Sequence, residues 1–264
     1  MYLDDIIIVS QSFEQHMELL EKVLSRLDTA KLTINLEKRQ FCRSELKYLG
    51  YVVNEHGLQV NPEKVKAIEQ FPQPTCASSL KRFIGLASWY RRFVYHFSTI
   101  MAPLHALTSK KAKFVWTDEC ENAFQIIKGK LMYAPILSCP VFSKEFDVYW
   151  DASSVGLGAI ISQEGRVIAY ASRSLTENER RYFTTELECL AVLWAIDKFR
   201  CDLEGYKFKV ITDHSALKWL QNLKDPKGRL GRWALALQSY NFEIIHRKGK
   251  EHQAPDALSR ATSL

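Results

Sequence analysis

Four acidic residues in the second half of the sequence occupy places from which their carboxylates could share one site. Asp151 and Asp213 each end an apolar, strand-like stretch. Glu188 lies within a long helical stretch, and Asp256 begins a short one. If the two strands are neighbours in a sheet, their carboxyl ends bring Asp151 and Asp213 together, where the helix residues can join them.

Such a cluster would have a definite chemistry. Carboxylate oxygens suit hard cations such as Mg²⁺ or Mn²⁺. Two of these ions about 3.5–4 Å apart can activate water and stabilise the leaving oxygen in phosphodiester cleavage. Taken singly, each residue is better explained as ordinary turn chemistry, so the prediction depends on the four acting together.

Two glutamates of the helical stretch 177–200 compete for one place in this site. At about 100° per residue, Glu186 shares its side with Asp197 and Arg200, which is typical of a solvated face. Glu188 points instead toward the apolar side, where a carboxylate is costly to bury without a partner or a metal. That side carries Ala191, Val192, Ala195 and Phe199, with Lys198 near its end. We therefore predict Glu188 as the ligand and keep Glu186 as the alternative.

The elements that must position these residues follow one another in the order β-β-β-α-β-α-α-β-α after residue 134, which predicts a mixed sheet flanked by helices. The predicted strands are 145–153, 156–163, 166–175, 206–213 and 242–247. The predicted helices are 177–200, 215–222, 229–239 and a short one from about 255.

The first half of the sequence is mostly helical after a short strand-like start. An apolar run directly behind Asp4 and Asp5 resembles the second arm of a hairpin, so we expect a piece of a longer polypeptide. Asn61 and Pro62 are a typical helix start, with an Asn cap followed by Pro at the first helical position. The remaining predictions are a hairpin over 47–60, which turns at 54–57, and helices over 13–32, 78–107 and 117–132.

Composition excludes several classes of protein. The chain has 264 residues, of which 47% are hydrophobic and 25% charged, which excludes disordered and collagen-like chains and suggests about two domains. The six cysteines include no C-x-x-C pair, which argues against a zinc knuckle or ribbon. Reduced thiols in an intracellular compartment, cytoplasmic or nuclear, are expected. No apolar run reaches the roughly 18–20 residues of a membrane span. The net charge of +6 permits a polyanionic partner.

Several motifs in the second half occur in the order found in one family. The stretches WDASSVGLGAIIS, RVIAYASRSLTENERRYFTTELECLAVLWAI, VITDHSALKWL and GRWALALQSYNFEIIHRKGKEHQAPDALSR resemble the ribonuclease H domain of gypsy-type long-terminal-repeat retrotransposon polyproteins. The resemblance implies an α/β (α+β) ribonuclease H-like fold with a mixed five-stranded sheet, which cleaves the RNA strand of RNA–DNA hybrids with two Mg²⁺ or Mn²⁺ ions. Its four metal carboxylates map onto Asp151, Glu188, Asp213 and Asp256. His246 stands where these domains often carry Tyr; it resembles a retroviral residue that helps proton transfer or product release, or it is a polar strand end.

The first half resembles the preceding part of the same polyproteins. Tyr2-Leu3-Asp4-Asp5 resembles the Y-x-D-D turn of reverse transcriptases, which implies that Asp4 and Asp5 hold the polymerase metal. LKYLGYVVNEHGLQVNPEKVKAI and FIGLASWYRRFVYHFSTIMAPLHALT resemble the primer-grip hairpin and the thumb. The implied division is a partial palm over 1–60, a thumb or connection over 61–133 and a ribonuclease H domain over 134–264. Because the family's third catalytic Asp lies upstream of this stretch, we expect no primer extension by this chain alone.

Basic and aromatic residues suggest two surfaces for RNA–DNA hybrid or template–primer, which would contact phosphates without reading sequence. The first combines Lys81, Arg82, Arg91 and Arg92 with Trp89 and Tyr90; the second comprises Lys227, Arg229, Arg232, Arg247, Lys248 and Lys250. Against this, aromatic residues at helical spacing more often belong to a core, and charge runs more often to solvated faces. The leading hypothesis is a retrotransposon nuclease, and the alternative is a catalytically silent, host-adopted or decayed nucleic-acid-binding protein. The rest of the polyprotein is the expected partner, and the oligomeric state stays open.

Overall fold

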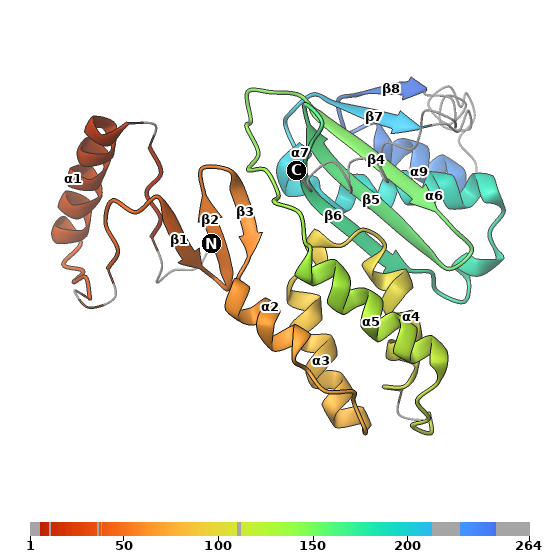
Figure 1. Cartoon of the computed structure of the whole chain (residues 1–264). Helices are drawn as coiled ribbons and strands as arrows, with labels where there is room; N and C mark the ends of the chain where they lie inside the picture. The colour runs from red at the N-terminus through yellow and green to blue at the C-terminus, as the bar shows by residue number, and fades with distance from the viewer. Residues whose placement is uncertain are drawn as a thin grey trace. The chain divides into compact units, whose positions relative to one another are not determined.

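The computed structural model describes residues 6–10, 12–35, 37, 39–109, 112–212 and 228–246. The chain divides into two compact units, Met1–Leu46 and Lys47–Leu264. Figure 1 shows the elements by label and colour.

The first unit is dominated by one helix, α1 (Phe13–Thr29). It begins where Ser12 accepts a hydrogen bond from the backbone N–H of Gln15 at 3.2 Å, an N-cap interaction. The predicted helix reached residue 32, but the chain turns at Lys31, whose φ of 57° is left-handed and incompatible with continuing the helix. None of the side chains of α1 is buried.

The predicted hairpin over 47–60 is confirmed as β2 (Tyr51–Asn54) and β3 (Gly57–Val60). With β1 (Glu45–Tyr48) they form a sheet in the order β1-β2-β3. Gly57 has a φ of 132°, and a Cβ there would collide with the carbonyl oxygen of Leu137, so only glycine fits this position.

A layer of helices follows: α2 (Pro62–Glu69), α3 (Ala77–Trp89), α4 (Phe97–Ala106) and α5 (Asp118–Met132). The predicted Asn61 cap is confirmed, since its Oδ1 accepts a hydrogen bond from the backbone N–H of Glu63 at 3.0 Å. The single helix predicted over 78–107 is wrong. Helix α3 ends at Trp89 and is followed by a short 3₁₀ turn (Arg91–Phe93). A new helix, α4, begins after His96, whose φ is 55°.

All five predicted strands are present and form one mixed sheet (Figure 1). Their order is β6-β5-β4-β7-β8, with β4–β5 and β5–β6 antiparallel, and β4–β7 and β7–β8 parallel. Strands β4, β7 and β8 therefore end at the same edge of the sheet. The strands are β4 (Phe146–Ala152), β5 (Gly156–Gln163), β6 (Arg166–Ser174), β7 (Phe208–Thr212) and β8 (Phe242–His246).

Helices cover both faces of this sheet. On one face, α6 (Thr184–Lys198), α7 (Arg200–Leu203) and α9 (Gly228–Leu237) share a core with Val148 and Trp150. On the other face, α3, α4 and α5 share a second core with Tyr149, Ile160, Val167, Tyr170 and Ile211. Alternate residues of β4 therefore enter opposite cores, as the two-residue period of a strand requires. The division at residue 134 stays a prediction, and this second core crosses it.

The helix predicted over 177–200 is shorter than expected. It starts at Thr184, after a 3₁₀ turn (Glu179–Arg181) and an extended Tyr182 with ψ of 147°. Arg173 of β6 forms a bidentate pair with Glu179, at 2.7 and 2.9 Å, which fastens this turn to the sheet instead of letting the helix run through it.

Candidate active site

Asp151 stands near the carboxyl end of β4, at the edge where the parallel strands end. Its side chain is 52% exposed. The expectation that the strands before Asp151 and Asp213 are neighbours is confirmed, since β4 and β7 pair in parallel with Tyr149 opposite Ile211. Asp213 itself follows β7 and lies outside the described residues, as does Asp256.

Glu188 lies on α6, which packs against β4. Its Oε2 accepts a hydrogen bond at 3.1 Å from the indole Nε1 of Trp150, the residue directly before Asp151. The half-buried carboxylate is thus attached to the strand end that carries the other described candidate.

Glu186 is engaged elsewhere. Its Oε2 accepts a hydrogen bond from the backbone N–H of Phe183 at 3.2 Å, which caps α6, and its Oε1 lies 3.3 Å from Nη1 of Arg229 on α9. With 23% of its side chain exposed, Glu186 does not lie on the solvated face that the helical pattern predicted.

His246 is the last residue of β8 and is exposed. It pairs with Thr212, the last residue of β7, so it shares the sheet edge of Asp151. Its position at a strand end is confirmed, and its role in chemistry stays a prediction.

The donor set fits a hard divalent cation, because the described candidates, Asp151 and Glu188, are both carboxylates. Within the ranges that the structure describes, no three His, Cys, Asp or Glu side chains form a metal-binding group. Asp4 and Asp5, the predicted polymerase ligands, fall outside those ranges.

The predicted basic surfaces are only partly described. Lys227, Arg247, Lys248 and Lys250 lie outside the described residues. Arg91 and Arg232 are exposed, and Arg92 is half-buried. The Arg229 guanidinium lies 4.0 Å from the centre of the Tyr182 ring and forms an ion pair with Glu186. It therefore makes contacts within the protein that stabilise the fold.

Trp89 and Tyr90 have structural contacts. Tyr90 is buried, and its hydroxyl donates to the carbonyl of Gly50 at 2.6 Å. Trp89 is 49% exposed and donates its indole N–H to the carbonyl of Leu49 at 3.2 Å. Both side chains therefore fasten the turn between β1 and β2 to the end of α3.

Sequence reasoning missed one residue beside the site. Nε2 of His96, from the helical layer, lies 3.6 Å from Oδ2 of Asp151. Burial lowers the pKa of His96, and the charge of Asp151 opposes that shift. The sequence pattern ran one helix through His96, and nothing in it points to a partner 55 residues later in the sequence.

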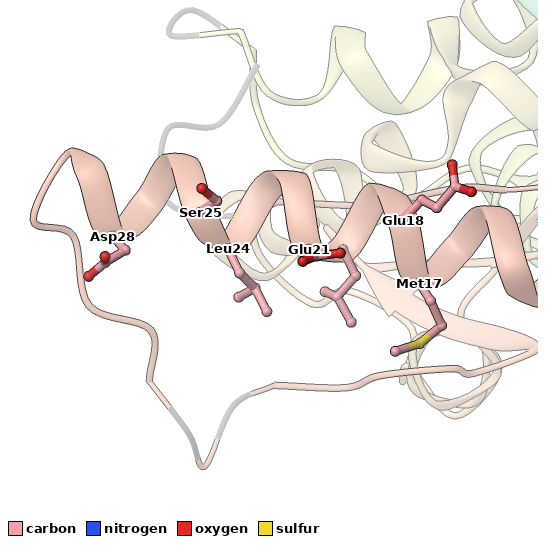
Figure 2. A pocket seen from close by; sticks show the side chains of 7 residues that line it. Met17, Glu18, Glu21, Leu24, Ser25 and Asp28 are labelled. Atoms are coloured by element: carbon pink, nitrogen blue, oxygen red, sulfur yellow. The ribbon is translucent and has the colours of Figure 1, made fainter.

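A shallow hollow lies along α1, and its lining contains none of the predicted site residues. Figure 2 shows Met17 and Leu24 on its wall. The lining residues are Met17, Glu18, Leu20, Glu21, Leu24, Ser25 and Asp28. Among the described helices, none is both long enough and apolar enough to cross a membrane.

Comparison with known proteins agrees with this geometry. Residues 141–240 match the family described as "RNase H-like domain found in reverse transcriptase", and residues 1–53 match "Reverse transcriptase (RNA-dependent DNA polymerase)". The fold resembles a foamy viral protease-reverse transcriptase solved in complex with RNA/DNA hybrid, with a TM-score of 0.80 and 24% identity over 92% of this chain and 34% of that one.

Relatives in sequence cover nearly the whole chain. The Pol polyproteins of the Drosophila melanogaster transposons 297 and gypsy are 40% and 36% identical to it over 98% of its length. The Tf2-3 polyprotein of Schizosaccharomyces pombe is 34% identical, also over 98%. The chain spans only 25%, 26% and 20% of these three proteins, respectively. It belongs to the Pol polyproteins of gypsy-type long-terminal-repeat retrotransposons, with the reverse transcriptase match at its start and the ribonuclease H-like match in its second half.

Proposed function

We propose that the second half of this chain hydrolyses the RNA strand of RNA–DNA hybrids. The observation that carries the proposal is the attachment of Glu188 to Trp150, next to Asp151, at the carboxyl end of β4. The parallel neighbour β7 ends at Thr212, and Asp213, the third acidic residue of the proposed set, follows it directly in the sequence.

In this proposal Asp151, Glu188, Asp213 and Asp256 would hold two Mg²⁺ or Mn²⁺ ions, and the bound ions would activate water and stabilise the leaving oxygen. The protein's part is to hold the carboxylates in place: Trp150 fixes one oxygen of Glu188, and the sheet fixes the backbone of Asp151. The exposed Arg232 would contact hybrid phosphates without reading sequence. We further propose that Asp4 and Asp5 serve RNA-directed DNA polymerisation in the full-length polyprotein, and that the chain acts inside the cell.

The test is hydrolysis of a hybrid labelled on each strand by the purified chain with Mg²⁺ or Mn²⁺. Asp151→Asn and Glu188→Gln should each abolish cleavage of the RNA strand, whereas the matched control Glu186→Gln should retain it and lose only stability, from the Arg229 ion pair and the cap of α6. A folded chain that binds the hybrid but cleaves neither strand would instead identify a silent binding protein. Loss of cleavage in Glu186→Gln with full activity in Glu188→Gln would reverse the assignment of the ligand.

A further inference from the structure

One row of residues across the sheet links the helical layer to the candidate site. Asp151 of β4 pairs with Gly158 of β5, and Gly158 pairs with Ser172 of β6. Ser172 accepts hydrogen bonds at 2.8 Å from both the backbone N–H and the hydroxyl of Ser98, at the start of α4. These bonds fasten the start of α4 to β6, which is separated from the strand of Asp151 by β5.

The local backbone aims His96 along this row. Its left-handed conformation, with φ of 55° and ψ of 26°, turns the chain sharply just before α4. The rings of Tyr95 and His96 lie 3.8 Å apart, centroid to centroid, and Tyr95 also packs against Tyr170 of β6 at 5.9 Å. These contacts restrict the imidazole to a small region above β5.

Gly158 provides the space that the imidazole occupies. A Cβ at this position would lie 2.9 Å from Cε1 and 3.0 Å from Nδ1 of His96. The ring therefore rests directly on the backbone of β5, and its Nε2 reaches 3.6 Å from Oδ2 of Asp151. At that distance the contact is longer than a direct hydrogen bond.

We propose that His96 is a positioning residue for Asp151, so that the nuclease site is completed by the helical layer that precedes its sheet. This inference rests on the proposed function. His96 acts through the carboxylate: it restrains the orientation of the Asp151 side chain, which is otherwise exposed at a strand end. Groups that orient metal-binding side chains in this way typically change metal affinity or activity about 10–100-fold when removed.

The experiment measures two properties of the purified chain: steady-state hydrolysis of the hybrid, and Mn²⁺ binding followed by electron paramagnetic resonance. His96→Ala should lower kcat and weaken Mn²⁺ binding by about 10-fold or more while KM for the hybrid is unchanged. His96→Asn should recover part of both losses, because Asn tolerates the left-handed backbone and keeps a polar group. His105→Ala, at the other end of α4, is the matched control and should change neither property.

Gly158→Ala tests the same contact from the other side. Its Cβ should displace the imidazole, reproduce the loss of His96→Ala and add little to it in the double variant, because both changes remove one interaction. Thermal unfolding checks that each variant folds.

The outcomes separate the two proposals. Unchanged kcat and Mn²⁺ affinity in His96→Ala, or an increase in either, overturn the positioning role. Weakened Mn²⁺ binding in His96→Ala without hydrolysis by the parent chain supports positioning and overturns the nuclease. A chain that neither binds Mn²⁺ nor cleaves overturns both.

Discussion

Trp150 and Glu188 are 38 residues apart in the sequence, yet the indole Nε1 of the first donates to Oε2 of the second at 3.1 Å. The bond joins β4 to α6 beside Asp151. A tryptophan in the core thereby fixes a carboxylate that the proposed chemistry requires, so packing and site geometry depend on the same side chain.

Replacing Trp150 with Phe should keep most of the core contacts and remove the donor. We expect kcat for hybrid hydrolysis to fall about 10-fold with little change in KM, since Glu188 loses its orientation. Trp89→Phe is the matched control, because it also removes an indole donor but acts on the turn at Leu49. Trp89→Phe should lower stability and leave kcat unchanged. A kcat of Trp150→Phe equal to that of the parent chain would contradict the orienting role of Trp150.

The pair of Arg173 and Glu179 should make stability depend on acid. The Arg173 side-chain hydrogen bonds lower the pKa of Glu179 from 4.5 to about 2, and the Glu179 side chain is only 15% exposed. Because the folded-state pKa lies below the unfolded one, the stabilisation is present above pH 4.5 and is lost as the pH falls toward 2. Glu179→Gln should therefore cost on the order of 2–3 kcal/mol at pH 7 and progressively less below pH 4.5.

Urea unfolding at several pH values measures this difference. The control is Glu164→Gln, which breaks an exposed pair with Lys144 and should cost less than about 1 kcal/mol at any pH. A cost for Glu179→Gln that stays constant between pH 7 and pH 3 would exclude the mechanism.

Two buried tyrosines should respond oppositely to loss of the hydroxyl. Burial raises the pKa of Tyr170 to about 12, and its hydroxyl has no hydrogen-bond partner among the described residues. Tyr170→Phe should thus leave the free energy of unfolding unchanged or raise it by about 1 kcal/mol. Tyr90→Phe, which loses a 2.6 Å bond to Gly50, should lower it by about 1 kcal/mol. Denaturant unfolding of both variants checks the pair, and a larger loss for Tyr170→Phe would reveal a partner.

The second core should make the helical layer and the sheet unfold together. Ile160 of β5 is fully buried in that core, so Ile160→Ala should cost about 2–5 kcal/mol. Hydrogen exchange should show amides of α5 and β5 losing protection by the same amount. Leu235→Ala, at a residue 55% exposed, should change little. Protection lost only in β5 would mean that the predicted boundary at residue 134 separates independent domains.

What could be predicted from the sequence was governed by local rules. The five strands and the Asn61 cap follow from periodicity and capping, which depend on near neighbours. The break at His96 and the late start of α6 were missed, because the first depends on a left-handed residue seated on the sheet and the second on the Arg173–Glu179 pair. Asp151 and Glu188 were predicted from position and polarity, whereas the contact of His96 with Asp151 exists only once α4 packs against β6 and His96 rests on Gly158 of β5.

The double-sided covering of the sheet limits how this segment can be exchanged between mobile elements. A recombination junction at residue 134 would transfer the sheet without α3, α4 and α5. Tyr149, Ile160 and Ile211 would then lose the helices that cover them. Such a hybrid protein would expose a large apolar surface of the sheet. Asp151 would also lack its contact with His96. A junction upstream of α3 would instead transfer the sheet together with the helices that cover it.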